Sequence, residues 1–379
     1  MNINTQLKSY IHISLWVLYL IIFPFQLFPP GSPQIADSLM LIGIFSFFFK
    51  KWTINNYIKI LSYFVFYTIL IGIFYSLINY DIEFLKTPLN YLYCLASLIF
   101  VSQIANHSKF IPSTILAIFI SLVIQLYVFT VIGLDETQFR FILYFNNPNQ
   151  LGLWALTQLV FISFLLQKHS KSVITLFLLS ASFILCIFYI SISISQAAII
   201  SAGLIIIFLF VSYARFKGLY IFLPIVLLFF ILYNNEIKNS EFKFLINIEN
   251  RINNEVNEDD GDNGLEGRNY TRLWQYPEYL FWGSGEGNSD RFGKEGMEIH
   301  STYANVLFSY GIFGFFLFVL PIINFIKKKS FFLSIILGAY LVFTLVHNTI
   351  RWPLFWIVPY LMYFIPSFQH KFVKTQNVI

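Results

Sequence analysis

Long apolar runs recur along the whole chain and constrain its fold more than any other feature. A helix needs about 20 mostly apolar residues to cross the hydrocarbon core of a bilayer. Only 11% of the residues are charged, whereas a soluble globular protein carries charge at roughly a quarter of its positions. The sequence therefore predicts an all-α polytopic membrane protein. Its twelve candidate spans lie near residues 11–28, 35–49, 58–79, 88–104, 111–133, 149–167, 173–190, 196–213, 218–233, 300–326, 331–347 and 353–366.

Basic residues divide unevenly between the loops that join these spans. With the N-terminus in the cytoplasm, fourteen Lys and Arg fall inside, and the short outer loops hold three, Lys86, Arg140 and Arg351. Lys and Arg concentrate in the cytoplasmic loops of membrane proteins. All nineteen Asp and Glu then fall on the outer side. We therefore expect both termini to be cytoplasmic.

One long outer loop, residues 234–299, separates nine spans within 1–233 from three spans and a cytoplasmic tail within 300–379. Its first part is acidic and is expected to be solvated and mobile. The second part, from Arg268 to Trp282, is rich in aromatic residues, which is typical of a short helix in the membrane interface. The turn-forming stretch Gly283-Ser-Gly-Glu-Gly287 follows, and its backbone N–H groups could bind an anion.

Several function classes are disfavoured by the residues that the spans contain. No predicted span carries Asp, Glu, Lys or Arg in its middle, although ion-coupled transporters usually need such groups along their path. Cys94 and Cys186 both lie inside apolar runs, so no disulfide framework, metal site or cofactor is expected. The lipid bilayer is an expected partner, and nucleic acid is not.

The unusual residues gather at the expected outer surface: Arg140, Arg268, Arg272, Arg291, His300, His347 and Arg351. A guanidinium binds phosphate through two parallel hydrogen bonds and stays charged at any accessible pH. A lipid-linked diphosphate is therefore a natural ligand for at least two arginines acting together. Any one arginine alone is better explained by a loop carboxylate or a lipid headgroup.

His300 is a candidate general base at the start of the tenth span. Helical spacing places Gly311 and Gly314 within about 40° of its face, where small residues would let a neighbouring helix approach closely. A neutral imidazole can take a proton from a sugar hydroxyl. A helix cap or a headgroup contact is the alternative, and for a lone histidine it is the stronger one.

Two polar stretches are weaker candidates. The amides of Asn147 and Asn149, in Asn146-Asn-Pro-Asn-Gln150, could bind sugar hydroxyls, although Asn-Pro also marks an ordinary turn and helix start. Ser191, Ser193, Ser195 and Gln196 form a polar patch between the seventh and eighth spans. Such a patch is more often a solvated turn or a set of interhelical hydrogen bonds than a site.

The order of these motifs resembles the O-antigen ligase and O-antigen polymerase superfamily. The resemblance rests on an Arg-rich aromatic segment, Gly-x-Gly, and His300-Ser301 followed by Gly311-x-x-Gly314. Phe145–Gly152 is similar to a further element of the polymerases. The resemblance covers residues 140–152 and 268–314 in motif and most of the chain in layout, and it implies a GT-C-like glycosyltransferase architecture.

The resemblance also implies an activity and a location. A polymerase of this superfamily moves a growing glycan from undecaprenyl diphosphate onto the next lipid-linked repeat unit, at the periplasmic face of the bacterial inner membrane and without a metal. By carry-over, His300 activates the acceptor hydroxyl. Arg272 or Arg268, with Arg140, holds the diphosphate leaving group, and Arg291 and Arg351 are further candidates for binding it. A chain-length regulator protein is an expected partner.

The chain departs from the family pattern in two places. Gln196 stands where the family often has an arginine after the serine patch. The spacing to Trp274 fits neither Arg268 nor Arg272 cleanly, and we favour Arg272. Polymerase is the first expectation, ligase onto lipid A–core the second, and a flippase of lipid-linked oligosaccharides the third; a flippase predicts related halves and a polar central path, and neither is visible.

Overall fold

The computed structural model describes residues 3–29, 31–47, 52–132, 140–169, 172–213, 267–293 and 298–376. Over this part of the chain the structure consists of helices and loops and contains no β-strand. The longer helices are α1 (Ile3–Ile22), α2 (Ile35–Phe47), α3 (Asn56–Asn79), α4 (Glu83–Ile104), α5 (Phe110–Ile132), α6 (Pro148–His169), α7 (Val173–Ser193), α8 (Gln196–Tyr213), α13 (Thr302–Lys328), α14 (Phe331–Val346) and α15 (Pro353–Gln376). Short helices α11 (Arg272–Gln275), α12 (Tyr279–Trp282) and η2 (Ser289–Phe292) precede α13.

Six of the helices in these ranges are long and apolar enough to cross a membrane by length and composition: α3, α4, α5, α6, α7 and α13. Shorter apolar helices make up all of α2 and α14 and parts of α1, α8 and α15. This agrees with the predicted all-helical polytopic membrane protein, while the count of twelve spans and the orientation stay predictions. The predicted ninth span, 218–233, and the acidic first part of the long loop lie outside the described residues.

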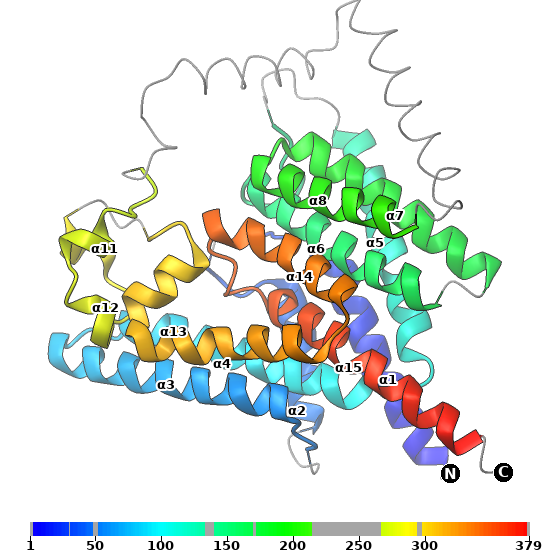
Figure 1. Cartoon of the computed structure of the whole chain (residues 1–379), viewed down its shortest axis with the longest axis horizontal. Helices are drawn as coiled ribbons and strands as arrows, with labels where there is room; N and C mark the ends of the chain where they lie inside the picture. The colour runs from blue at the N-terminus through cyan, green and yellow to red at the C-terminus, as the bar shows by residue number, and fades with distance from the viewer. Residues whose placement is uncertain are drawn as a thin grey trace, which may run out of the picture.

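Helix α6 forms the centre of one group of helices (Figure 1). It packs against α7, α8, α14 and α15, and 83% of its apolar window is buried inside the protein. Trp154, Leu156 and Leu159 are completely buried on it. Its side chains therefore meet other helices on nearly every face, whereas α7 is only 33% buried over its own window.

Helices α3, α4 and α13 lie side by side in the second group (Figure 1), with α15 packed against α4. Aromatic rings fill the space between them. The ring of Phe64 on α3 lies 5.9 Å from that of Tyr91, 6.1 Å from that of Tyr310 and 5.5 Å from that of Phe318, between centroids. Large rings bury much apolar area at low cost in side-chain entropy, so they fix this group firmly.

The loops expected on the outer side meet at one end of the helices, which we call the loop end. Backbone hydrogen bonds join Gln26 to Tyr144 and Phe141 to Ile192, and the rings of Phe23 and Trp352 lie 5.1 Å apart. At the opposite end, the Asn55 side chain caps α3 by accepting from the Ile58 N–H. Loop contacts that close one end of the bundle bring residues distant in sequence into one site.

Candidate active site

Helix α13 begins at Thr302, with Ser301 as its N-cap. The Ser301 hydroxyl accepts from the Ala304 N–H at 3.3 Å, and serine is a favoured residue at this position because it satisfies a free N–H of the first turn. His300 therefore precedes the helix. The expectation that His300, Gly311 and Gly314 share one helical face is wrong, because His300 is not helical and the helix is interrupted at Gly311.

Gly311 breaks α13 with φ 64° and ψ −175°. The break leaves the carbonyls of Phe308 and Ser309 without their normal partners in the next turn. They accept instead from the N–H groups of Ser284 and Gly285, at 2.9 and 2.8 Å. The glycine-rich loop is thus docked on α13, and two of the N–H groups proposed for an anion nest are already used.

Neighbouring segments approach α13 so closely at Gly311 and Gly314 that both positions require glycine. A Cβ at Gly311 would overlap the Phe281 carbonyl oxygen, and a Cβ at Gly314 would lie 3.1 Å from the Tyr67 ring of α3. Gly283, on the loop that packs against α13, is equally restricted, since a Cβ there would lie 2.6 Å from the Ser309 carbonyl oxygen. The predicted close packing is confirmed, although it positions the loop before α13 rather than the histidine directly.

His300 is exposed and is held by two contacts to main-chain atoms. Its backbone N–H donates to the Arg268 carbonyl at 3.2 Å. Its ring Nδ1 lies 3.0 Å from the Glu298 carbonyl oxygen. A carbonyl oxygen can only accept, so Nδ1 carries the hydrogen and the Nε2 of a neutral ring carries the lone pair. This contact favours the tautomer that a general base needs, with Nε2 as the basic atom.

Arg268 ties this loop to the end of α14. Its guanidinium donates from Nη1 to the Val346 carbonyl at 3.0 Å, and the neighbouring Tyr270 hydroxyl donates to the Leu345 carbonyl at 2.6 Å. Carbonyls in the last turn of a helix lack intrahelical partners, so both contacts satisfy α14. They also place Arg268 beside His347.

His347 follows α14 and packs its ring on Phe343, with the centroids 4.6 Å apart. Burial first, and then the nearby charges of Arg268, His300 and Arg140, together lower its pKa to about 4. These three groups therefore act on one imidazole from separate parts of the chain. We call Arg140, Arg268, His300 and His347 the basic cluster.

Arg140 reaches the basic cluster from the loop before α6. Its Nε donates to the Ser193 carbonyl at 3.0 Å and its Nη2 to the Asn149 side-chain oxygen at 2.9 Å. Asn147 accepts from the Gln150 N–H through its side-chain oxygen at 2.9 Å, which is the ordinary helix-start role. Of the two predicted glycan-binding amides, Asn149 positions Arg140 and Asn147 caps α6.

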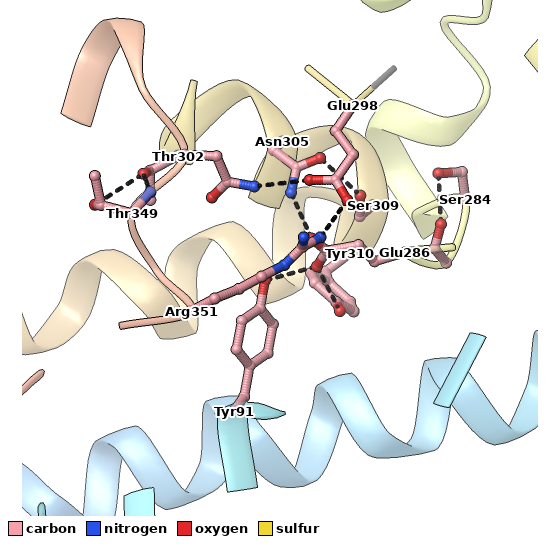
Figure 2. A network of polar contacts seen from close by, with 12 residues as sticks. Tyr91, Ser284, Glu286, Glu298, Thr302, Asn305, Ser309, Tyr310, Thr349 and Arg351 are labelled. Atoms are coloured by element: carbon pink, nitrogen blue, oxygen red, sulfur yellow. Dashed lines mark hydrogen bonds and ion pairs between the residues drawn. The ribbon is translucent and has the colours of Figure 1, made fainter. Parts of the chain in front are cut away.

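Glu286 is a buried residue of this end of the protein that the sequence motifs do not single out. It is 3% exposed, and Figure 2 shows its carboxylate at the centre of a polar network. Oε2 accepts from the Tyr91 and Tyr310 hydroxyls, at 2.6 and 2.9 Å, and Oε1 accepts from the Asn305 amide at 2.8 Å. A buried carboxylate needs such partners. Its only sequence signal was one acid between two glycines.

Arg351 completes the network from the loop before α15. Its Nη2 lies 2.7 Å from Glu286 Oε1 and 2.6 Å from Glu298 Oε1. Burial alone would lower the pKa of Arg351, but these two carboxylates raise it well above its ordinary value. Its charge is thus already matched by protein carboxylates, and Arg351 lies in an ion-pair network rather than in an open anion site.

Arg272 and Arg291 are also engaged with the protein. Arg272 is 4% exposed, with its guanidinium 5.3 Å from the centroid of the Phe292 ring. Arg291 donates to the carbonyls of Ser284 and Gly285 and lies 4.6 Å from the ring of Phe84. Burial lowers the pKa of both guanidinium groups. The structure places Arg268 beside His300 and His347 and places Arg140 near His347, and it leaves Arg272 and Arg291 beside aromatic rings.

Metal ligands do not gather at this end of the described residues: none of their His, Cys, Asp and Glu form a group of three or more that could hold an ion. Cys94 and Cys186 are both free and buried.

Comparison with curated proteins finds no match. Residues 181–319 do match a family model, described as O-Antigen ligase. The matched stretch contains the serine patch at the end of α7, Arg268, the glycine-rich loop, His300 and the break at Gly311. The match confirms the resemblance of this chain to the O-antigen ligase and O-antigen polymerase superfamily.

Proposed function

We propose that the protein is an O-antigen polymerase, a glycosyltransferase that joins undecaprenyl-diphosphate-linked repeat units at the periplasmic face of the bacterial inner membrane. One observation carries this proposal: Arg268 and His300 lie within the family match and are joined by a hydrogen bond inside the basic cluster. Cations around a neutral imidazole suit a reaction that needs a base beside a developing anion.

In the proposed reaction, His300 Nε2 takes the proton of the acceptor sugar hydroxyl. The hydroxyl oxygen attacks the anomeric carbon of the donor glycan, and the bond from that carbon to the diphosphate oxygen breaks. The bonding electrons leave with undecaprenyl diphosphate. Arg268 and Arg140 stabilise the charge that develops on it, since fixed cations act most strongly where charge appears in the transition state.

The contacts favour Arg268 over Arg272 as the family arginine. Arg268 accepts the His300 N–H on its carbonyl and acts electrostatically on His347, whereas the Arg272 side chain is nearly inaccessible to solvent. A diphosphate must reach the guanidinium through solvent or the headgroup layer. We therefore assign the leaving group to Arg268 with Arg140, and to Arg272 a role in supporting the loop.

A ligase is the second candidate, and the description of the matching family model favours it directly. Ligase and polymerase share the donor and differ in the acceptor, which is lipid A–core for a ligase. The described residues offer the same base and the same cations to either acceptor, so the acceptor must be tested in cells.

The size ladder of surface glycans in a deletion strain tests the function. Lipid A–core with one repeat unit and nothing longer supports the polymerase, because ligation still works. Complete loss of attached glycan, with long chains left on the lipid carrier, supports the ligase. An unchanged ladder would refute both and return a flippase to consideration.

Complementation of the deletion strain then tests the base. His300→Ala should reduce chain extension by about 100-fold or more, the usual contribution of a general base, at an unchanged amount of membrane protein. His107→Ala is the matched control, because His107 lies at the opposite end, where its ring contacts that of Tyr10. Full activity of the His300 variant would show that another group takes the proton.

A further inference from the structure

Arg351, Glu298 and His300 form a continuous chain of contacts, and we propose that Arg351 is a positioning residue that sets the ring tautomer of His300 through Glu298. This assignment rests on the proposed function for its catalytic meaning. It differs from the sequence prediction, in which Arg351 binds the diphosphate of the substrate.

The first link is the ion pair. One nitrogen of Arg351, Nη2, meets a carboxylate oxygen of Glu286 and one of Glu298 (Figure 2). The guanidinium therefore joins two parts of the loop that are twelve residues apart in sequence. Because two carboxylates face one cation, the group has no excess positive charge for a substrate anion.

The second link is the rigidity of the Glu286 side of the pair. Tyr91 on α4 and two residues of α13, Asn305 and Tyr310, all donate to the Glu286 carboxylate. With Arg351, the carboxylate has four donors from three separate parts of the chain. Hydrogen-bonded donors on both of its oxygens hold the Glu286 carboxylate in one arrangement, so the Arg351 Nη2 paired with it is fixed relative to the helices.

The third link is Glu298, which is held through both its side chain and its main chain. Its Oε1 accepts from Arg351 at 2.6 Å, and its Oε2 accepts from the Asn348 amide at 3.4 Å. Its carbonyl oxygen accepts from His300 Nδ1 at 3.0 Å. When the side chain is fixed, the carbonyl is fixed as well, and the His300 ring is held with Nδ1 protonated.

The chain of contacts gives Arg351 an effect on catalysis without contact with substrate. A histidine whose Nδ1–H is held by a carbonyl presents Nε2 to the outside as its basic atom. Without the Arg351 pair, the Glu298 carbonyl can turn away, and the ring can then protonate at either nitrogen. The fraction of His300 in the active form would fall even if the fold survived.

Solid-state ¹⁵N NMR of histidine-labelled protein in liposomes measures this tautomer directly, because protonated and unprotonated ring nitrogens resonate far apart. The His300 signals are identified by their loss in His300→Asn. At a pH where the ring is neutral, we expect the wild-type protein to show His300 with hydrogen on Nδ1 alone. In Arg351→Gln, we expect both tautomers of His300.

Three variants sharpen the test. Arg351→Lys should keep the single tautomer, because one nitrogen makes both ion pairs and a lysine also provides one nitrogen. Glu298→Gln should give both tautomers while leaving the Arg351–Glu286 pair, so it serves if Arg351→Gln fails to fold. Lys86→Gln is the control: it removes an exposed cation that pairs with Glu83 at 3.8 Å, and it should leave the tautomer unchanged.

The outcomes separate this inference from the proposed function. Hydrogen on His300 Nε2 in the wild-type protein, or one unchanged tautomer in both Arg351→Gln and Glu298→Gln, overturns the positioning role. An unchanged glycan ladder in the deletion strain refutes the proposed activity, yet the NMR result still decides how the ring is held. If both stand, Arg351→Gln should lose at least tenfold in chain extension, and Arg351→Lys should recover most of it.

Discussion

His347 is a single residue whose surroundings keep it neutral. Its pKa is lowered to about 4 by burial and by the charges of Arg268, His300 and Arg140, while an unperturbed histidine titrates near 6.5. Between these values the unfolded chain binds a proton that the folded protein does not. Stability due to neutral His347 is therefore complete above about pH 6.5 and is lost as the pH falls toward 4.

Unfolding of the purified protein in detergent tests this at the scale of one residue. We expect the free energy of unfolding of the wild-type protein to fall by on the order of 2 kcal/mol between pH 6.5 and pH 4. The unfolding temperature should fall over the same range. His347→Gln should show a smaller fall over the same range, whereas His107→Gln should behave as wild type. Equal pH dependence in all three proteins would contradict a neutral His347.

The break in α13 belongs to the scale of the element. Gly311 has a backbone conformation that is nearly restricted to glycine, and a Cβ there would overlap the Phe281 carbonyl oxygen. Both effects act against any side chain, and the surrounding atoms are backbone, which cannot move aside easily. The docking of the glycine-rich loop on α13 depends on this one position.

Gly311→Ala should therefore lower the free energy of unfolding by more than about 2 kcal/mol and reduce the protein recovered from the membrane. Gly338→Ala on α14 is the matched control, since a Cβ there meets no atom within 4 Å. Alanine favours a helix over glycine, so the control should be as stable as wild type or slightly more so. Thermal unfolding of both variants measures the difference.

Helices were predictable where one physical rule decided them. Apolar runs near 58–79 and 173–190 matched α3 and α7 closely, because length and apolarity suffice to recognise a span. The start of α13 and its break were not predictable this way. Regular helical spacing predicts one face that continues across Gly311. Neither the N-cap at Ser301 nor the positive φ of Gly311 changes the hydropathy of the sequence.

The network around Glu286 acts at the scale of the whole molecule, because it ties α4, the glycine-rich loop, α13 and the loop before α15 together. Tyr91 and Arg351, which both bond to Glu286, are far apart in the sequence. The sequence predicted arginines and a histidine at one end of the bundle, but pairing depends on which loops meet. Hence Arg351 was expected to face substrate and instead faces two carboxylates.

Glu286→Gln should destabilise the protein by about 3 kcal/mol, the usual result of removing one partner from a buried ion pair. The amide would also direct N–H groups at a site surrounded by donors. Glu83→Gln provides the comparison, because the Glu83 side chain is 58% exposed and its carboxylate pairs with Lys86 at 3.8 Å. A similar unfolding temperature for both variants would mean that the network adds little to stability.

Helix α6 has a consequence for how the protein is made. Surrounded on nearly all sides by α7, α8, α14 and α15, it buries Thr157, Gln158 and Ser163, which are costly to expose to hydrocarbon. All four of those neighbours are synthesised after it, and α14 and α15 come last. During translation, the polar side chains of α6 must therefore be kept out of the lipid by the translocon or an insertase until α14 and α15 have been inserted.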